Sequence, residues 1–102
     1  MSDSDQTHER LKQLTQRFIE RSRQDLAVIR VERDPARLRP VVHRLSGAAG
    51  TFGYRELSRL AGEVDDVLVE GGAPSEAELA RLIDEIERTV SPESSMRSGG
   101  TA

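Results

Sequence analysis

The sequence predicts an all-α protein, an antiparallel four-helix bundle, on three observations. Four stretches repeat apolar residues at the three- and four-residue spacing of one helix face, and none is apolar all round. The connections between them are short and carry proline, glycine or capping signals. Strand signals are almost absent, since the only β-leaning stretch is 28–31. We therefore expect the four apolar faces to pack around one core.

The first predicted helix covers about residues 6–32, and the second covers about 35–52. The apolar face of the first comprises Leu11, Leu14, Phe18, Ser22, Leu26 and Ile29. Asp34-Pro35 is typical of an N-cap followed by proline at the first helical position, so the second helix begins there. The apolar stripe of the second helix comprises Leu38, Val41, Val42, Leu45, Ala48, Ala49 and Phe52.

The third predicted helix covers 54–70, after Gly53, and the fourth covers 75–90. Gly71-Gly72 is a helix C-terminal signal, and Ser75 with Glu78 has the spacing of a capping box. The apolar positions of the third helix are Leu57, Leu60, Ala61, Val64, Val67 and Leu68. Those of the fourth helix are Leu79, Leu82, Ile83, Ile86 and Val90.

The length of 102 residues fits a single domain, which we place at 6–90. The polar ends, 1–5 and 91–102, are expected to be disordered because they offer little to bury. The absence of cysteine excludes a disulfide scaffold and thiolate zinc sites. No apolar run approaches the roughly 18–20 residues of a membrane span, and the acidic N-terminus does not resemble a secretory signal. We therefore expect a cytoplasmic protein with no membrane partner.

Charge is unevenly distributed, although the net charge is only −3. Residues 10–44 carry ten basic and four acidic side chains, whereas 45–102 carry five basic and eleven acidic ones. The basic half raises the possibility of nucleic-acid binding, but its arginines alternate with acids and no recognition motif follows. A solvated face explains most of these charges, and we expect no nucleic-acid partner.

His43 is the most informative residue. On a helical wheel it lies about 160° from the centre of the apolar stripe of the second helix, so its imidazole is expected in solvent. The other histidine, His8, lies in the polar start of the first helix and is expected to be solvated. Neither histidine has carboxylates at metal-ligand spacing.

The helix face around His43 is stripped of long side chains. Ala36, Pro40, Gly47 and Gly50 lie within about 60° of it on the wheel. Glycine and proline inside a helix cost roughly 1 and 3 kcal/mol, so the helix does not need them. We interpret these four residues as a docking surface that lets a partner approach the backbone and the imidazole. The alternative, that the glycines permit close packing between helices, is disfavoured because both point away from the apolar stripe.

The neutral imidazole of an exposed histidine is a nucleophile that can accept a phosphoryl group. Phosphoryl transfer depends mainly on positioning and on charge stabilisation. This chain carries no Gly-x-x-x-x-Gly-Lys loop and no cluster of metal-binding carboxylates on the His43 face. The metal and much of the electrostatics would have to come from a partner.

The residues that follow His43 match a known pattern. The run from His43 to Gly53, HRLSGAAGTFG, followed by Leu57 and Leu60, resembles the histidine-containing phosphotransfer (HPt) domain family. The family pattern is His-x-Leu-Lys-Gly, small residues, a glycine ten after the histidine, and a leucine-spaced helix. The resemblance covers roughly residues 8–90, including the four-helix layout.

The resemblance implies that His43 is the phosphoacceptor, through Nε2, of a multistep two-component phosphorelay. It would take the phosphoryl group from an aspartyl phosphate on a receiver domain, usually of a hybrid histidine kinase. It would then pass the group to the receiver of a response regulator. The family implies a phosphoryl carrier with no intrinsic cofactor, not an enzyme, because the receiver brings Mg²⁺. Family members of this size are commonly monomers.

One position departs from the family pattern. The lysine that often stands three residues after the histidine is Ser46 here, which brings a hydroxyl but no charge. Arg39, one turn before His43, is expected to compensate in part, and Arg44 points more to the side. We therefore name Arg39, Arg44 and Ser46 as residues that support the phosphoryl group.

Two functional classes remain open at the level of the sequence. The first is a phosphoryl carrier that uses His43. The second is an HPt-like helical adaptor that binds receiver or kinase domains and is never phosphorylated. Both would use the same docking face.

Overall fold

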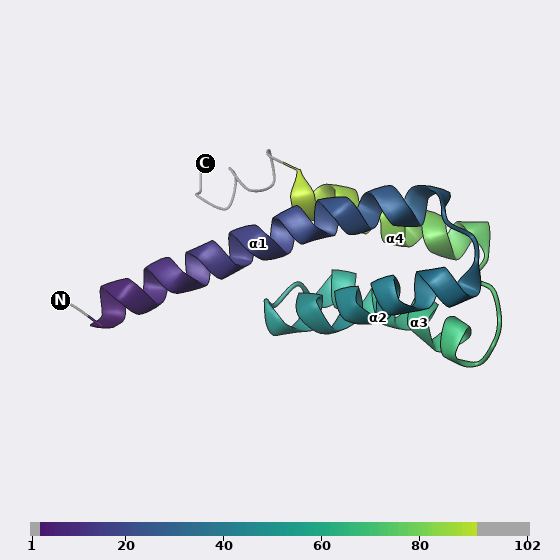
Figure 1. Ribbon diagram of the computed structural model, residues 1–102, viewed down its shortest axis with the longest axis horizontal. Helices are drawn as coiled ribbons and strands as arrows, with labels where there is room; N and C mark the ends of the chain where they lie inside the picture. The colour runs from purple at the N-terminus through teal and green to yellow at the C-terminus, as the bar shows by residue number, and fades with distance from the viewer. Residues whose placement is uncertain (1–2, 92–102) are drawn as a thin grey trace.

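The computed structural model describes residues 3–91, which form four α-helices (Figure 1). Helix α1 spans Asp3–Val31, α2 Pro35–Thr51, α3 Arg55–Val69 and α4 Glu76–Val90. The predicted all-α four-helix bundle is therefore confirmed, with boundaries within one residue of prediction except at the start of α1. That helix begins at Asp3, so residues 3–5, predicted to be disordered, are helical. The predicted tail 92–102 lies outside the described residues.

Each helix packs against two neighbours, in the cyclic order α1, α2, α3, α4 and back to α1. The buried core comprises Phe18, Leu26, Ile29, Leu38, Val42, Leu45, Ala49, Leu57, Leu60, Ala61, Val64, Leu68, Leu79, Leu82, Ile86 and Val90. Val41, Ala48, Phe52 and Ile83 are partly buried against it. The apolar stripes predicted for α2, α3 and α4 therefore face inward, as short antiparallel helices require, except for Val67 of α3, which is only partly buried and lies outside the core.

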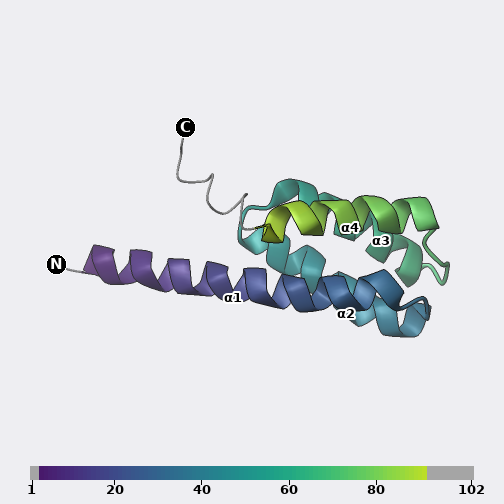
Figure 2. The same cartoon turned by 90° about the horizontal axis from the view of Figure 1, so that it is seen from above.

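The N-terminal half of α1 departs from the prediction. Leu11 and Leu14 were expected in the core, but they are 53% and 38% exposed. With 29 residues α1 is about 43 Å long, whereas its partners have 15 to 17 residues and reach about 22–26 Å. The first turns of α1 therefore extend past the end of the bundle, as both views show (Figures 1 and 2).

The predicted end signals act as expected. The Asp34 side chain accepts a hydrogen bond from the Ala36 amide at 3.0 Å, which caps α2. Ser75 and Glu78 form the capping box of α4, with both reciprocal bonds present. Gly53 and Gly71 take positive φ angles of 83° and 86°, which glycine adopts without strain, and so end α2 and α3.

Aromatic stacking closes the end of the bundle next to the α2–α3 turn. The Phe18 ring stacks on Phe52 and on Tyr54, each with ring centroids 5.2 Å apart. From residue 6 onward, Phe18 is the first buried residue of α1, so this stack marks where the projecting part of α1 meets the core.

Candidate functional site

The site is built on α2, which runs unbroken through Pro40. Proline lacks an amide hydrogen, so Pro40 gives up one helical hydrogen bond without ending the helix. Leu38, Val42 and Leu45 fix the rotation of α2 by packing its inner face into the core. His43 is consequently held on the outer face.

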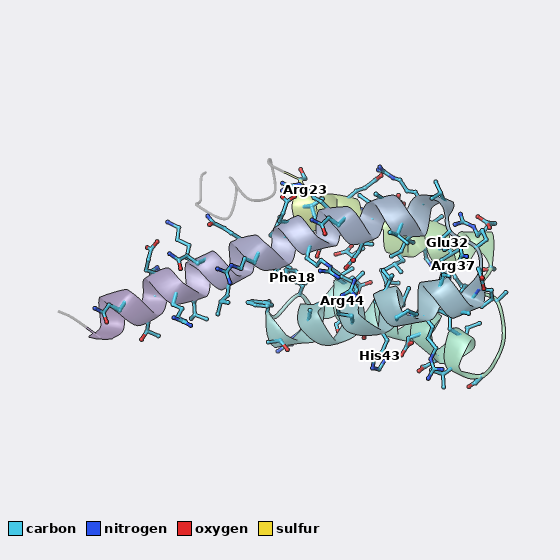
Figure 3. All side chains as sticks on the ribbon, in the orientation of Figure 1. Phe18, Arg23, Glu32, Arg37, His43 and Arg44 are labelled. Atoms are coloured by element: carbon cyan, nitrogen blue, oxygen red, sulfur yellow. The ribbon has the colours of Figure 1, made fainter. Side chains whose placement is uncertain are left out.

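The His43 imidazole is exposed and oriented. Its side chain is 74% exposed, as the helical wheel predicted, and it points away from α1 (Figure 3). Its Nδ1 lies 2.9 Å from Oδ2 of Asp65 on α3. The Asp65 side chain is only 13% exposed, so the ring rests on a buried carboxylate while its outer edge faces solvent.

This contact selects the tautomer. A carboxylate oxygen can only accept, so Nδ1 carries the hydrogen and donates it to Asp65. In the neutral ring Nε2 is then the nitrogen with a free lone pair. The arrangement presents one nucleophilic nitrogen to solvent in a fixed direction.

The four residues predicted as the docking surface, Ala36, Pro40, Gly47 and Gly50, are all exposed on the same helix as His43. A methyl group built on Gly47 meets nothing within 4 Å, so the backbone there is open to an approaching surface. We call these residues the small-residue strip. Their role in docking stays a prediction.

Gly50 also has a packing role, contrary to the expectation from the helical wheel. A methyl group built on Gly50 would lie 3.2 Å from Oγ of Ser58 on α3. The hydroxyls of Ser46 and Ser58 donate to each other's backbone carbonyls, at 3.3 Å and 3.0 Å. Small side chains therefore bring α2 and α3 together along one edge of the strip.

The three predicted phosphoryl-supporting residues point in different directions. Arg39 is exposed one turn before His43 and has no ion pair among the described residues. Arg44 instead donates to Asp25 on α1 at 2.8 Å, on the other side of α2 from His43 (Figure 3). The Ser46 hydroxyl is engaged with the Ser58 carbonyl. Only Arg39 therefore keeps its charge on the His43 side without a partner.

Sequence reasoning missed Asp65. Its signal is an acidic residue at the edge of the α3 apolar stripe, one turn after Ala61 and three residues before Leu68. A carboxylate at such a position is costly unless a hydrogen-bond donor meets it. The pattern alone did not say which donor on another helix that would be.

Within residues 3–91, no three His, Asp or Glu side chains gather in a group that could hold a metal ion. His8 is exposed on the projecting part of α1, as expected. None of the described helices is both long and apolar enough to cross a bilayer.

Comparison with protein families matches the chain to the Hpt domain over residues 13–91. Searches of the curated proteins and of the solved structures found no match. The family match spans most of the chain, including all of α2, α3 and α4 and the site built on His43. Hpt domains carry phosphoryl groups on histidine in phosphorelays and interact with receiver domains. The chain therefore belongs to the Hpt domain family.

Proposed function

We propose that this chain is a phosphoryl carrier in which Nε2 of His43 takes a phosphoryl group from the aspartyl phosphate of one receiver domain and delivers it to the aspartate of another. The observation that supports this most is the His43–Asp65 pair. In the neutral ring it leaves the free lone pair on Nε2, on a side chain that is exposed to solvent. In this proposal the chain acts as a cytoplasmic monomer between a hybrid histidine kinase and a response regulator.

The geometry supports the following chemical step. The Nε2 lone pair attacks phosphorus, an N–P bond forms, and the P–O bond to the receiver aspartate breaks with the electron pair leaving on the carboxylate. The phosphorylated ring, still protonated on Nδ1, is a cation, and the Asp65 carboxylate at 2.9 Å stabilises it. Attack by the aspartate of the second receiver reverses these bond changes.

The partner supplies what the carrier lacks. We expect Mg²⁺ to be held by the receiver domain, where it would neutralise the charge of the phosphoryl group during transfer. The small-residue strip lets the receiver bring its aspartate close to His43, because no long side chain stands in the way. This division of work describes a carrier without independent catalytic activity.

The proposal is tested by incubating the full chain with a phosphorylated receiver domain. We expect acid-labile, alkali-stable label on the wild-type chain and none on His43→Gln, whereas His8→Gln is labelled normally. Label that persists in His43→Gln would move the acceptor elsewhere. Receiver binding without any label would support the alternative, an adaptor that is never phosphorylated.

Docking is tested separately with Gly47→Arg. The open space around Gly47 lets the arginine fit without disturbing the fold, so the helical circular dichroism signal is expected to stay unchanged. Transfer is expected to be blocked because the new side chain covers the approach to His43. Full transfer in this variant would exclude the small-residue strip as the docking surface.

Arg39 is proposed to replace part of the charge of the missing lysine. Arg39→Ala is expected to lower the transfer rate about two- to fivefold, which corresponds to the worth of an exposed charge interaction. Arg81→Ala, an exposed arginine on α4, is the matched control. An unchanged rate together with an unchanged phosphohistidine lifetime would contradict this role.

A further inference from the structure

Helices α2 and α3 pack against each other along their length (Figure 1), and their contacts follow one antiparallel register. His43 of α2 meets Asp65 of α3 at 2.9 Å. Three residues later on α2 and three residues earlier on α3, Ser46 faces Gly62, since a methyl group built on Gly62 would lie 3.5 Å from Ser46 Oγ. The contact between Ser46 and Gly62 therefore lies directly beside the contact that orients the imidazole.

The next contact in this register also joins small residues. A methyl group built on Gly50 would lie 3.2 Å from Oγ of Ser58. The hydroxyls of Ser46 and Ser58 donate to each other's backbone carbonyls, at 3.3 Å and 3.0 Å. A serine side chain is short, so it reaches the backbone of a neighbouring helix only where the two helices pass close together. The separation of packed helices depends on the side chains at their contact, and here these side chains are minimal.

The close approach of the helices matters for Asp65, because its side chain is also short. A single methylene group joins the carboxylate to Cα, and the carboxylate contacts Nδ1 of His43 at 2.9 Å. An increase of about 1 Å in this distance would take the carboxylate out of hydrogen-bond range. Asp65 would then be buried without any partner among the described residues, because its other oxygen, Oδ1, has none.

The backbone of α3 does not require glycine at position 62. Gly62 lies in the middle of the helix, and its φ angle is not positive, unlike those of Gly53 and Gly71. Glycine is a poor helix former, so a larger residue would favour the helix itself. The contact with Ser46 supplies a reason for this position to stay small.

We propose that Gly62 is a positioning residue for the phosphotransfer on His43. Because Gly62 has no side chain, α3 stays close enough to α2, across Ser46, for the Asp65 carboxylate to reach Nδ1. The inference rests on the proposed function and extends it to a residue that acts only through Asp65. It also gives Ser46 a role other than supplying charge, since its small side chain keeps the two helices together beside His43.

The test compares Gly62→Val with the wild-type full chain and with Gly47→Val. The valine at position 62 would press its branched side chain against Ser46, whereas a methyl group at position 47 meets nothing within 4 Å. The first readout is the ¹⁵N NMR spectrum of the neutral His43 ring, recorded without any receiver. We expect the Nδ1–H tautomer in the wild-type chain and in Gly47→Val, and a larger share of Nε2–H in Gly62→Val.

The second readout is the initial rate of His43 labelling. Gly62→Val is expected to slow labelling by a receiver about tenfold, within the range seen when orienting partners of functional histidines are lost. Labelling by phosphoramidate needs no receiver, because Nε2 attacks phosphorus, the P–N bond breaks and ammonia leaves. It should slow by a similar factor. Slowing with the receiver alone would mean that the valine obstructs docking, and would overturn the proposal.

Rescue by a longer side chain distinguishes positioning from a general loss of stability. Glutamate has one methylene group more than aspartate, so it can span a wider gap between α2 and α3. Asp65→Glu alone is expected to slow labelling, because its side chain is too long for the native spacing. Combined with Gly62→Val, it should make labelling faster than in Gly62→Val alone. In an Asp65→Asn background, Gly62→Val should slow labelling by less than about twofold, because the contact through which it acts is already lost.

A second variant approaches the same contact from α2. Ser46→Val adds bulk opposite Gly62 and removes the hydroxyl that bonds to the Ser58 carbonyl, so it should shift the His43 tautomer in the same direction even if Gly62→Val does not fold. Circular dichroism identifies the folded variants. A folded Gly62→Val or Ser46→Val with the wild-type ring spectrum, or no rescue by Asp65→Glu, would overturn the proposal. The ring spectrum requires no phosphate, so failure of the proposed phosphotransfer would be recognised separately, by the absence of label on the wild-type chain.

Discussion

The orientation of His43 depends on a residue of another helix. Asp65 is one of the buried residues of α3, and its Oδ1 is buried without a partner among the described residues. Burying a carboxylate costs stability. The same carboxylate orients the ring and accepts the hydrogen of Nδ1, and in the proposed function it would face the cation formed on phosphorylation.

Asp65→Asn is expected to lower the rate of His43 phosphorylation by about tenfold or more, the size of effect that orienting partners of functional histidines have. The amide has no charge to offset the phosphorylated ring, and its NH₂ group can donate to Nδ1 and thereby move the ring hydrogen to Nε2. Initial rates of labelling measure the effect. Asp66→Asn, the exposed neighbour, is the control. Equal rates in the two variants would show that Asp65 has no part in transfer.

Ser22 is a second buried polar residue that lacks a hydrogen-bond partner among the described residues. It is 1% exposed, and its hydroxyl has no hydrogen-bond partner among the described residues. Ser22→Ala is therefore expected to raise the free energy of unfolding by about 1 kcal/mol. Ser46→Ala, which removes a hydroxyl bonded to the Ser58 carbonyl, should change it in the opposite direction. Urea denaturation of both variants checks the signs, and a destabilised Ser22→Ala would refute the assignment.

Among the elements, α2 carries the site, and the residues of the site lower its intrinsic helical stability. Its outer face has residues that weaken helices, and its inner face compensates by burying Leu38, Val42, Leu45 and Ala49. Tertiary packing, more than intrinsic propensity, therefore keeps α2 helical.

The two glycines of the strip should respond differently to alanine. Gly47→Ala is expected to stabilise the fold by about 0.5–1 kcal/mol, because its new methyl group meets nothing. Gly50→Ala should gain less, since its methyl group would approach Ser58 Oγ at 3.2 Å. Thermal unfolding of the single variants, and of Gly50→Ala combined with Ser58→Ala, measures the difference. A larger gain at Gly50 than at Gly47 would contradict the packing described.

At the scale of the whole molecule, one ion pair links distant parts of the chain. Arg33, in the α1–α2 connection, donates to both carboxylate oxygens of Glu76 at the start of α4, at 2.9 Å and 3.1 Å. These hydrogen bonds lower the pKa of Glu76 below its usual range. The pair therefore connects the α1–α2 connection to the N-terminus of α4.

Because the folded-state pKa of Glu76 is depressed, its stabilising contribution is present above the unfolded-state pKa and is lost as pH falls through the folded value. Arg33→Gln should therefore lower the unfolding midpoint slightly at pH 7, with a difference that shrinks below about pH 4 and in high salt. Thermal melts across pH measure this. A difference that grew on acidification would contradict the assignment.

The helices, their caps and most of the core were predictable, since they follow from local spacing and from residues such as Asp34, Gly53 and Ser75. The exposure of His43 followed from the same periodicity. Helical periodicity did not predict three other features. These are the separation of Arg44 from His43, the contact of Gly50 with Ser58 and the exposure of Leu11. Each depends on where a second helix lies or ends.

The sequence by itself therefore determined which residues form helices and which face of α2 carries the histidine, because helical periodicity is a local property. Only the tertiary structure decided that Asp65, 22 residues after His43, contacts Nδ1 of His43. Only the tertiary structure likewise decided that α1 extends past the ends of the helices it packs against. Contacts across helices depend on their crossing and relative length, which local spacing does not encode.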